Sequence, residues 1–405
     1  MISVLTRIFG FHNLSLVEDV VQDAFYQALE VWKFRGMPDD PRAWLMAVAK
    51  RRAIDVLRRE RTAQAFAPEI GRLAESEWTL VPAVEQRFAP HAIQDDLLRM
   101  MFSCCDPRLA EEAQVALVLH FLCGFSVAEV AGALVAGHAA VEKRIGRAKK
   151  VLAGSRGLYE IADERQFAAR LPAVQRALYL LFNEGYHGAS AEAVVRGELC
   201  REAMRLTGLL LQHPAGDTPA TRALRALMCL HAARLPARLD AEGELRTLFE
   251  QDRGRWDRAL LAEGQRLLES SASGPELSDY HVEAAIAWVH GSAATAEDTN
   301  WAQIVALYDQ LMALRPSPVI ALNRAIAIGQ LEGPERGLAE IRSIERLEKL
   351  ESYPFLPAAL GELELRRGSR AAAREHFANA RALARNDAER RFFEHRVEAC
   401  EGARS

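Results

Sequence analysis

The chain lacks the long apolar run that a membrane-spanning helix needs. Its longest apolar stretch, Ala113 to Phe125, is interrupted by Gln114 and His120 and is well short of the roughly 20 residues that cross a bilayer. The first residues, MISVLTRIFGF, have neither the charged start nor the small-residue cleavage site of a secretory signal. The sequence therefore predicts a cytoplasmic protein without a membrane segment.

Cysteine is scarce and has no regular spacing. The chain contains no CxxC pair, whereas disulfide frameworks and structural zinc sites use paired, regular spacings. We therefore expect reduced, buried thiols and no metal. A zinc site built from His120, Cys123 and the neighbouring Cys104–Cys105 pair remains a minor alternative. The six cysteines are Cys104, Cys105, Cys123, Cys200, Cys229 and Cys400.

Motifs of catalysis are also missing, because the chain has neither a glycine-rich phosphate loop nor a nucleophile elbow. Two groups superficially resemble an acid–base or metal site: Asn183, Glu184, Tyr186 and His187 in one, His281 and Glu283 in the other. A structural turn between helices explains the first group better. The sequence therefore predicts a protein that is not an enzyme and needs no cofactor.

Strand-like alternation is absent, and almost every segment longer than ten residues has helical periodicity. We expect an all-α fold, and 405 residues exceed what one hydrophobic core usually supports. The blocks are 1–62, a proline-containing acidic tether at 63–94, then 95–153 and 154–405. Because the net charge is only -4, any nucleic-acid-binding surface has to be local.

The first block predicts two helices. One, from about Leu16 to Val31, has an exposed acidic face opposite a buried stripe. A loop follows at Lys33–Asp39, and Asp40-Pro41 starts a second helix that runs to about Arg61. The acidic face is Glu18, Asp19, Gln22 and Asp23, and the stripe is Val17, Val20, Val21, Ala24, Phe25, Ala28 and Trp32.

The second helix of this block displays many cations, namely Lys50, Arg51, Arg52, Arg58, Arg59 and Arg61. Contact with nucleic acid would use them. A solvated face with i,i+4 ion pairs, such as Arg51–Asp55 and Asp55–Arg59, explains them equally well.

The block at 95–153 predicts a helix-turn-helix. A helix from Glu111 to Cys123 ends at Gly124, Ser126 caps a short helix to Leu134, and a last helix runs from about His138 to Leu152. In that motif the second helix enters the major groove, although surface charge alone would also produce a basic helix. Its exposed side carries Lys143, Arg144, Arg147, Lys149 and Lys150 against Glu142.

The last block is alanine-rich and helical, with a weak repeat at about 300–400. Its period of 36 residues is close to the roughly 34 of a tetratricopeptide helix pair. Such pairs form a concave surface for a peptide or protein, while a plain packed array is the alternative. The repeat pattern is carried by Leu360, Gly361, Gly368, Ala373, Phe377 and Ala380, with Arg324, Ala325, Gly337, Ile341 and Ile344 at corresponding positions one unit earlier.

Several long motifs resemble one family, the extracytoplasmic-function sigma factors of the sigma-70 family. Residues 17–25, 41–45 and 49–55 resemble sigma region 2, while 95–105 and 143–149 resemble region 4. Residues 182–186, 252–257, 296–301 and 316–325 resemble the subgroup with a tetratricopeptide-like C-terminal extension. Compared with the family pattern, region 2 starts late, so its first helix is expected to be short. Gly137 and Gly146 also stand where bulkier residues are usual.

The resemblance implies a transcription initiation factor with three sets of site residues. Core RNA polymerase would be bound through its β′ clamp helices and β flap, and the acidic face of the first helix would contact the clamp helices. Bases and phosphates of the minus-10 element would meet Phe34, Arg35, Arg51, Arg52, Arg58 and Arg59. The minus-35 element would meet His138, Lys143, Arg144, Arg147, Lys149 and Lys150, and the acidic tether would run toward the RNA exit path.

The fused C-terminal block would control the factor from within the chain, in place of a separate anti-sigma protein or by recruiting a protein or peptide partner. The competing interpretation is a ligand-responsive helix-turn-helix regulator with the repeats as its sensor. Region 2 argues against it, because an operator-binding protein has no use for the first block.

Overall fold

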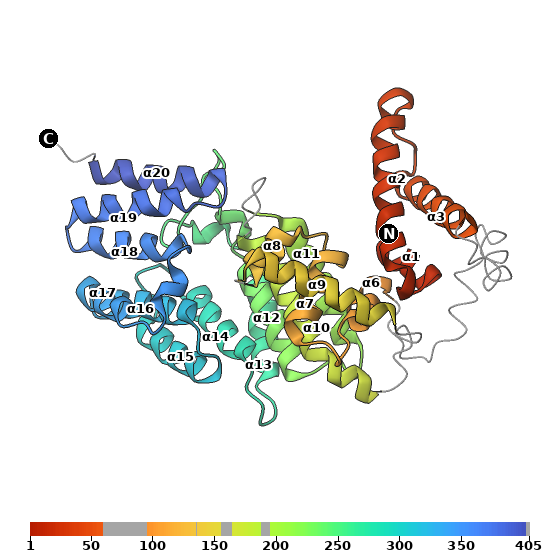
Figure 1. Cartoon of the computed structure of the whole chain (residues 1–405). Helices are drawn as coiled ribbons and strands as arrows, with labels where there is room; N and C mark the ends of the chain where they lie inside the picture. Colours follow the sequence, from red (N-terminus) through yellow and green to blue (C-terminus); the bar gives the residue numbers. More distant parts are fainter. Residues whose placement is uncertain (60–94, 135, 155–163, 188–194, 402–405) are drawn as a thin grey trace. The chain divides into compact units, whose positions relative to one another are not determined.

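The computed structural model is helical throughout the residues it describes, which are 1–59, 95–134, 136–154, 164–187 and 195–401 (Figure 1). No strand occurs in these ranges, and a single isolated bridge joins Leu239 to Leu245. The predicted all-α fold, with a helical array in the C-terminal block, is therefore confirmed. The predicted tether at 63–94 lies outside the described residues.

The chain divides into two compact units, one made of Met1–Ala177 with His213–Ala215 and the other of Leu178–Gln212 with Gly216–Ser405. Helix α10 (Glu164–His187) contributes to both. Its first half lies in the block predicted as C-terminal but packs in the first unit. There the Phe167 ring stacks on Phe102 at 4.4 Å, and Arg170 Nη1 donates to the Phe102 carbonyl at 2.9 Å.

The first unit begins with three helices around one apolar core. Val17 and Val20 of α2 are almost fully buried, as are Ala49 and Ala53 of α3. Trp32 and Trp44 close this core with ring centroids 5.4 Å apart. The elements are α1 (Ile2–Phe9), the short η1 (Phe11–Asn13), α2 (Leu14–Arg35) and α3 (Pro41–Arg59).

Two details of the first predicted helix are wrong. Helix α2 continues through Lys33 and Phe34 to Arg35, because none of these residues breaks a helix and cations are favourable at a C-terminus. It ends at Gly36, whose φ of 77° suits glycine alone. Phe25, expected in the buried stripe, is 51% exposed. The described neighbours of α2 cover a narrower face than the stripe assumed.

The rest of the first unit is the predicted helix-turn-helix and its support. A capping box starts α8, in which Glu129 N–H donates to Ser126 Oγ and Ser126 N–H donates to the Glu129 carboxylate. Gly124, with φ 74°, ends the preceding helix as expected. The elements are α6 (Asp96–Cys104), α7 (Glu111–Leu117), η2 (Val118–Leu122), α8 (Val127–Ala133) and α9 (His138–Ala153).

None of the six cysteines, all of which lie in the described residues, forms a disulfide, and all but Cys123 are buried. Burial is the main cause that raises the pKa of Cys104 to about 12, and the same holds for Cys200 and Cys229. In the described part of the chain, no three His, Cys, Asp or Glu side chains are arranged to hold a metal ion. His120 Nδ1 instead lies 2.7 Å from the Phe125 carbonyl oxygen.

The second unit is an array of helices in which successive members pack against each other (Figure 1). Close approach at the pairs needs small residues: a Cβ on Gly337 would lie 2.8 Å from the Gly329 Cα, and one on Gly361 would lie 2.8 Å from the Phe377 ring. Its helices are the end of α10, α11 (Gly197–Gln212), α12 (Pro219–Ala232), α13 (Arg258–Ser271), α14 (Asp279–Ser292), α15 (Trp301–Leu314), α16 (Pro318–Leu331), α17 (Pro334–Arg342), α18 (Phe355–Arg366), α19 (Arg370–Ala382) and α20 (Asp387–Glu401), with the short η3 (Leu235–Ala237), η4 (Arg253–Arg255) and η5 (Leu347–Leu350).

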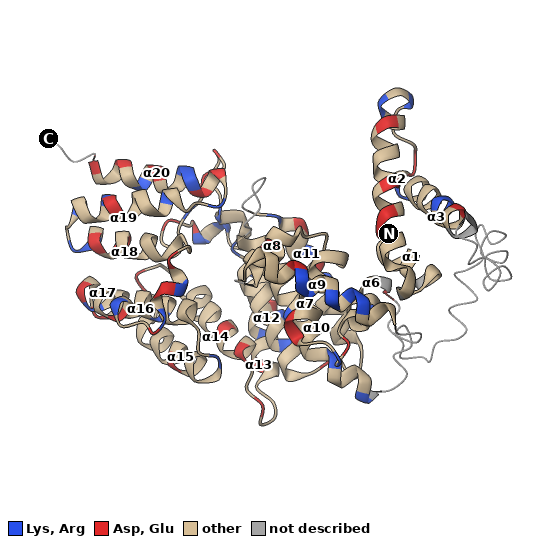
Figure 2. Ribbon diagram, in the orientation of Figure 1, with Lys and Arg blue, Asp and Glu red and all other residues tan. Residues whose placement is uncertain are grey.

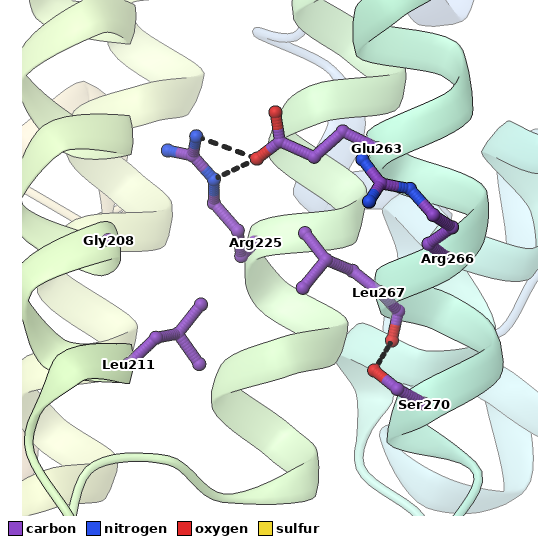
Figure 3. A pocket seen from close by; sticks show the side chains of 7 residues that line it. All are labelled: Gly208, Leu211, Arg225, Glu263, Arg266, Leu267 and Ser270. Carbon is purple, nitrogen blue, oxygen red and sulfur yellow. Dashed lines mark hydrogen bonds and ion pairs between the residues drawn. The ribbon is translucent and has the colours of Figure 1, made fainter.

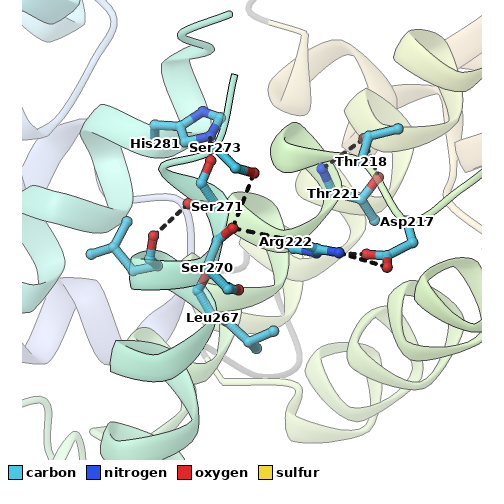
Figure 4. A network of polar contacts seen from close by, with 10 residues as sticks. Asp217, Thr218, Thr221, Arg222, Leu267, Ser270, Ser271, Ser273 and His281 are labelled. Atoms are coloured by element: carbon cyan, nitrogen blue, oxygen red, sulfur yellow. Dashed lines mark hydrogen bonds and ion pairs between the residues drawn. The ribbon is translucent and has the colours of Figure 1, made fainter. Parts of the chain in front are cut away.

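A polar network fastens the ends of three of these helices (Figure 4). Arg222 of α12 pairs with Asp217 at 2.7 Å and donates to the Ser270 carbonyl at 3.3 Å. His281 lies 2.8 Å from Ser278 Oγ in the cap of α14, while Glu283 accepts hydrogen bonds from Tyr179 and Arg315. The contacts of His281 and Glu283 are therefore those of structural residues.

Candidate nucleic-acid interface

The acidic face predicted on α2 lies at the surface. Asp19, Gln22 and Asp23 are exposed, because the residues between them fill the core beneath. Glu18 is half-buried. Asp23 forms an ion pair with Arg52 of α3, with Oδ2 and Nε 3.1 Å apart, and both side chains remain more than half exposed. An exposed pair of this kind contributes about 1 kcal/mol or less, so both partners can exchange it for other contacts.

An apolar patch, defined here as Phe25, Tyr26 and Leu29, continues this face along α2. These side chains are 51%, 66% and 75% exposed. Their spacing of three and four residues makes them neighbours on the helix surface, and Gln22 lies one turn before them. Contiguous exposed apolar side chains mark surfaces that bind other proteins. No sequence signal indicated this patch, because the periodicity placed Phe25 in the buried stripe of the helix.

The predicted minus-10 residues are found at the end of α2 and along α3. Phe34 is 83% exposed, and Arg35, Arg51 and Arg52 are exposed as well. In the described part of the chain, Arg51 forms no ion pair with Asp55, although i,i+4 pairing was one explanation of this charge. The side chains of Arg58 and Arg59, at the end of α3, lie outside the described residues. The described cations thus include one, Arg51, that is available to a ligand.

The second helix of the helix-turn-helix buries one side and exposes a basic one (Figure 2). Val141, Ile145, Ala148 and Leu152 form the buried seam of α9. Gly137 begins the helix with extended backbone, and Gly146 lies inside it with open space around its Cα. Around this seam His138, Lys143, Arg147 and Lys150 are exposed, Arg144 is half-buried, and none of these five forms an ion pair with a described residue.

Lys149, the remaining predicted phosphate-binding residue, differs from the others. Its Nζ lies 2.9 Å from Oε2 of Glu18 and 4.5 Å from the centroid of the Phe121 ring. This ion pair joins the acidic face of α2 to the basic helix α9. Since the two residues are far apart in sequence, no local pattern could have revealed the contact.

The group around Asn183–His187 lies in the last turns of helix α10, so the structural turn expected there from the sequence is wrong. Glu184 is buried and pairs with Arg196 at 3.2 Å. Tyr186 is also buried, and its ring lies under the guanidinium of Arg238 at 4.2 Å. The contacts of Glu184 and Tyr186 are thus with arginines of the second unit.

Comparison with known proteins gives matches to two family models and to a bacterial protein. Residues 1–63, which include α1 to α3, match the family model described as Sigma-70 region 2. Residues 170–272 match a family of unknown function, DUF6596. A Rhizobium meliloti protein, printed as "Uncharacterized protein R00370", is 38% identical over 382 residues, which cover 94% of this chain and 88% of that protein. No solved structure matches the chain.

Proposed function

We propose that this chain, as a member of the sigma-70 family, binds core RNA polymerase and directs it to specific promoters. The chain also belongs to the same family as the Rhizobium meliloti protein. The match of residues 1–63 to sigma-70 region 2 carries the proposal. The finer assignment is to the extracytoplasmic-function type. Support for it comes from the order of the parts, in which region 2 precedes a helix-turn-helix block along the chain.

The polymerase interface in this proposal combines the acidic face of α2 with the apolar patch. Asp19, Gln22 and Asp23 supply charge that steers association, and Phe25, Tyr26 and Leu29 supply the apolar area that a stable interface buries. The β′ clamp helices are the proposed partner, and the β flap is the proposed partner of the helix-turn-helix block. Glu18 joins the acidic face only when Lys149 releases it.

The DNA interface in this proposal has two parts. Phe34 and Arg35, with Arg51 and Arg52, meet the minus-10 element, where an exposed ring can stack on an unpaired base. Helix α9 enters the major groove at minus-35 with His138, Lys143, Arg144 and Arg147, while Lys149 and Lys150 contact the backbone. Arg58 and Arg59 extend the first part on sequence grounds alone.

The Glu18–Lys149 ion pair has a place in this mechanism. It occupies one proposed polymerase-binding residue and one proposed DNA-binding residue at the same time. Binding of either partner therefore has to break the pair. We propose that the free protein keeps these two surfaces partly engaged with each other, and that the polymerase separates them.

The C-terminal array is proposed as a built-in regulator with tetratricopeptide-like pairs at about 300–400. The small-residue contacts at Gly329, Gly337 and Gly361 support this reading of the helix pairs. Removal of the residues after His187, which keeps the part of α10 that packs in the first unit, tests it. Promoter activity that is the same with and without the array would overturn the regulatory role.

Transcription in vitro tests the main proposal. Purified bacterial core polymerase plus this protein should give promoter-specific transcripts from genomic fragments. The transcripts should be lost on Arg51→Gln with Arg52→Gln, and also on Lys143→Gln with Arg144→Gln. Arg390→Gln, which removes an exposed cation of α20, is the matched control. DNA binding without core polymerase, together with no transcripts, would favour the ligand-responsive regulator instead.

A further inference from the structure

Three arginines of the second unit gather without a carboxylate partner. Arg234 and Arg238 flank η3, and Arg253 begins η4. Arg234 Nε reaches only the Gln251 side-chain oxygen at 3.4 Å, and Arg253 Nη1 donates to the carbonyls of His290 and Ala293, both at 2.7 Å. None of the three forms an ion pair within the described residues. We call these three the cationic cluster.

Aromatic rings hold the cationic cluster together. The indole of Trp256 contacts two guanidiniums, with the Arg234 Cζ 5.7 Å and the Arg253 Cζ 4.7 Å from its centroid. The Tyr186 ring carries Arg238 at 4.2 Å and also faces His231 at 5.0 Å. Stacking on aromatic faces is a common way to keep a guanidinium in place while its N–H groups stay available.

Hydrogen-bond donors around the cluster are left unused. Arg238 Nε, Arg253 Nη2 and the Trp256 indole N–H are buried and have no partner among the described residues. Tyr186 Oη and the Nδ1 atoms of His231 and His290 are also buried without a hydrogen-bond partner among the described residues, and each of these atoms can donate or accept. Trp256 is 3% exposed and Arg238 is 8% exposed. Leaving a buried polar group unpaired is costly, so this many at one place point to a missing acceptor.

The electrostatics also favour an anion. Burial, together with the guanidiniums of Arg234 and Arg238, lowers the pKa of His231 to about 3. Burial and the guanidiniums of Arg234 and Arg253 do the same for His290. The carboxylates that act on the pKa of Arg253 are those of Glu297 and Asp298, both on an exposed turn. The field at the cluster is therefore positive even though the histidines are neutral.

Two arginines of helix α12, in the same unit, are paired with carboxylates. Arg225 of α12 pairs with Glu263 of α13 at 2.9 Å and donates to the Met204 carbonyl, in a pocket of about 440 Å³ (Figure 3). Arg222 pairs with Asp217 (Figure 4). The charges of Arg225 and Arg222 are therefore already neutralised by carboxylates. The cationic cluster, which lies after the C-terminal end of α12, has no such carboxylate partner among the described residues.

We propose that the cationic cluster is a binding site for a small oxyanion, a phosphate or carboxylate group. Arginine presents paired N–H donors that match both groups, and the indole and phenol add neutral donors. Arg234, His231 and His290 are half-buried and not fully enclosed. The burial of Arg238 and Trp256 favours a small ligand over a protein segment. This site lies in the second unit and does not depend on the proposed polymerase and DNA interfaces.

Calorimetric titration of the full chain tests the site, with inorganic phosphate in one arm and succinate in the other, at constant ionic strength in chloride. The wild-type protein should bind at least one of them. Arg238→Gln and Arg234→Gln should each raise the dissociation constant about tenfold or more, which is the loss of affinity expected for one charge-assisted hydrogen bond. Arg222→Gln, which removes a neutralised arginine of α12, should change it less than twofold.

The two arms also identify the source of the oxyanion. Binding of phosphate alone indicates a phosphate-bearing ligand, and binding of succinate alone indicates a carboxylate. Thermal unfolding without ligand checks the fold of each variant, and Arg238→Lys, which keeps the charge but not the fork, should give an intermediate affinity. Equal affinity in wild type and Arg238→Gln would overturn the proposal, and so would the absence of binding in both arms.

Discussion

Lys149 Nζ lies 2.9 Å from Glu18 Oε2, across 131 residues of sequence, and both side chains are mostly withdrawn from solvent. The pair thereby links helix α2 to the basic helix of the helix-turn-helix. Partial burial makes such a pair stronger than a fully exposed one, because water and salt screen it less.

A double-mutant cycle measures this link. Glu18→Gln, Lys149→Gln and the double variant, unfolded in urea, should give a coupling free energy of about 0.5–1 kcal/mol. The exposed pair Asp23–Arg52 is the comparison and should give less. A coupling of zero between Glu18 and Lys149 would mean that the two helices do not hold each other in solution.

The apolar patch predicts a separation of binding from stability. Leu29→Ser should leave the free energy of unfolding within about 0.5 kcal/mol of wild type, because Leu29 is 75% exposed. The same variant should bind core polymerase at least tenfold more weakly in a pull-down titration or by fluorescence anisotropy. Leu331→Ser, at an exposed position of α16, should change neither quantity. Unchanged polymerase binding by Leu29→Ser would remove the patch from the interface.

Salt dependence separates phosphate contacts from base contacts on α9. For holoenzyme on promoter DNA, loss of one phosphate contact should reduce the slope of log affinity against log salt by about 0.9. Lys150→Gln should show this reduction for all promoter sequences alike. Lys143→Gln should also change the preference among minus-35 sequences. If both variants behaved alike on all sequences, α9 would not read bases.

Two glycines predict opposite effects of the same substitution. Gly146→Ala should stabilise the protein by up to about 1 kcal/mol, because the residue lies inside α9 and a Cβ there meets nothing within 4 Å. Gly361→Ala should destabilise the second unit by about 1–3 kcal/mol, because its Cβ would press on the Phe377 ring. Thermal unfolding of both variants checks the signs.

The two histidines beside the cationic cluster, His231 and His290, predict an effect of pH on stability. The pKa values of His231 and His290 are about 3 when folded and near 6.5 when unfolded, so the unfolded state binds more protons between these limits. Stability should therefore fall as pH drops below about 6.5, by up to about 1.4 kcal/mol per pH unit for each histidine. The slope of unfolding free energy against pH should be smaller in His231→Gln. An identical slope would show that His231 does not contribute.

Local signals were enough to predict much of this structure. Gly124 and Ser126 indicated where one helix of the helix-turn-helix ends and the next begins, because a terminating glycine and a cap act on their own helix. The acidic and basic faces followed from periodicity in the same way. Which face of α2 is covered depends on neighbours, so Phe25 was placed in the core although it lies at the surface.

Contacts between distant residues were beyond the reach of these patterns. Nothing near Glu18 indicates Lys149, and Tyr186 gives no sign of Arg238, since each pair is brought together only by the packing of separate helices. The cationic cluster and the aromatic and histidine side chains around it come from α10, α12, α14 and the segments at η3 and η4. A sequence reading that works one helix at a time sees five unremarkable segments there.

The burial of the thiols has a practical consequence for spectroscopy. Cys104, Cys105, Cys200, Cys229 and Cys400 are buried, and burial raises the pKa of each, so the thiolate that reacts with a maleimide is scarce at neutral pH. Cys123 alone among the six is half-buried, and it lies beside the turn of the helix-turn-helix. A fluorophore could thus be attached to the natural protein at Cys123, without engineered cysteines, to follow the helix-turn-helix in real time.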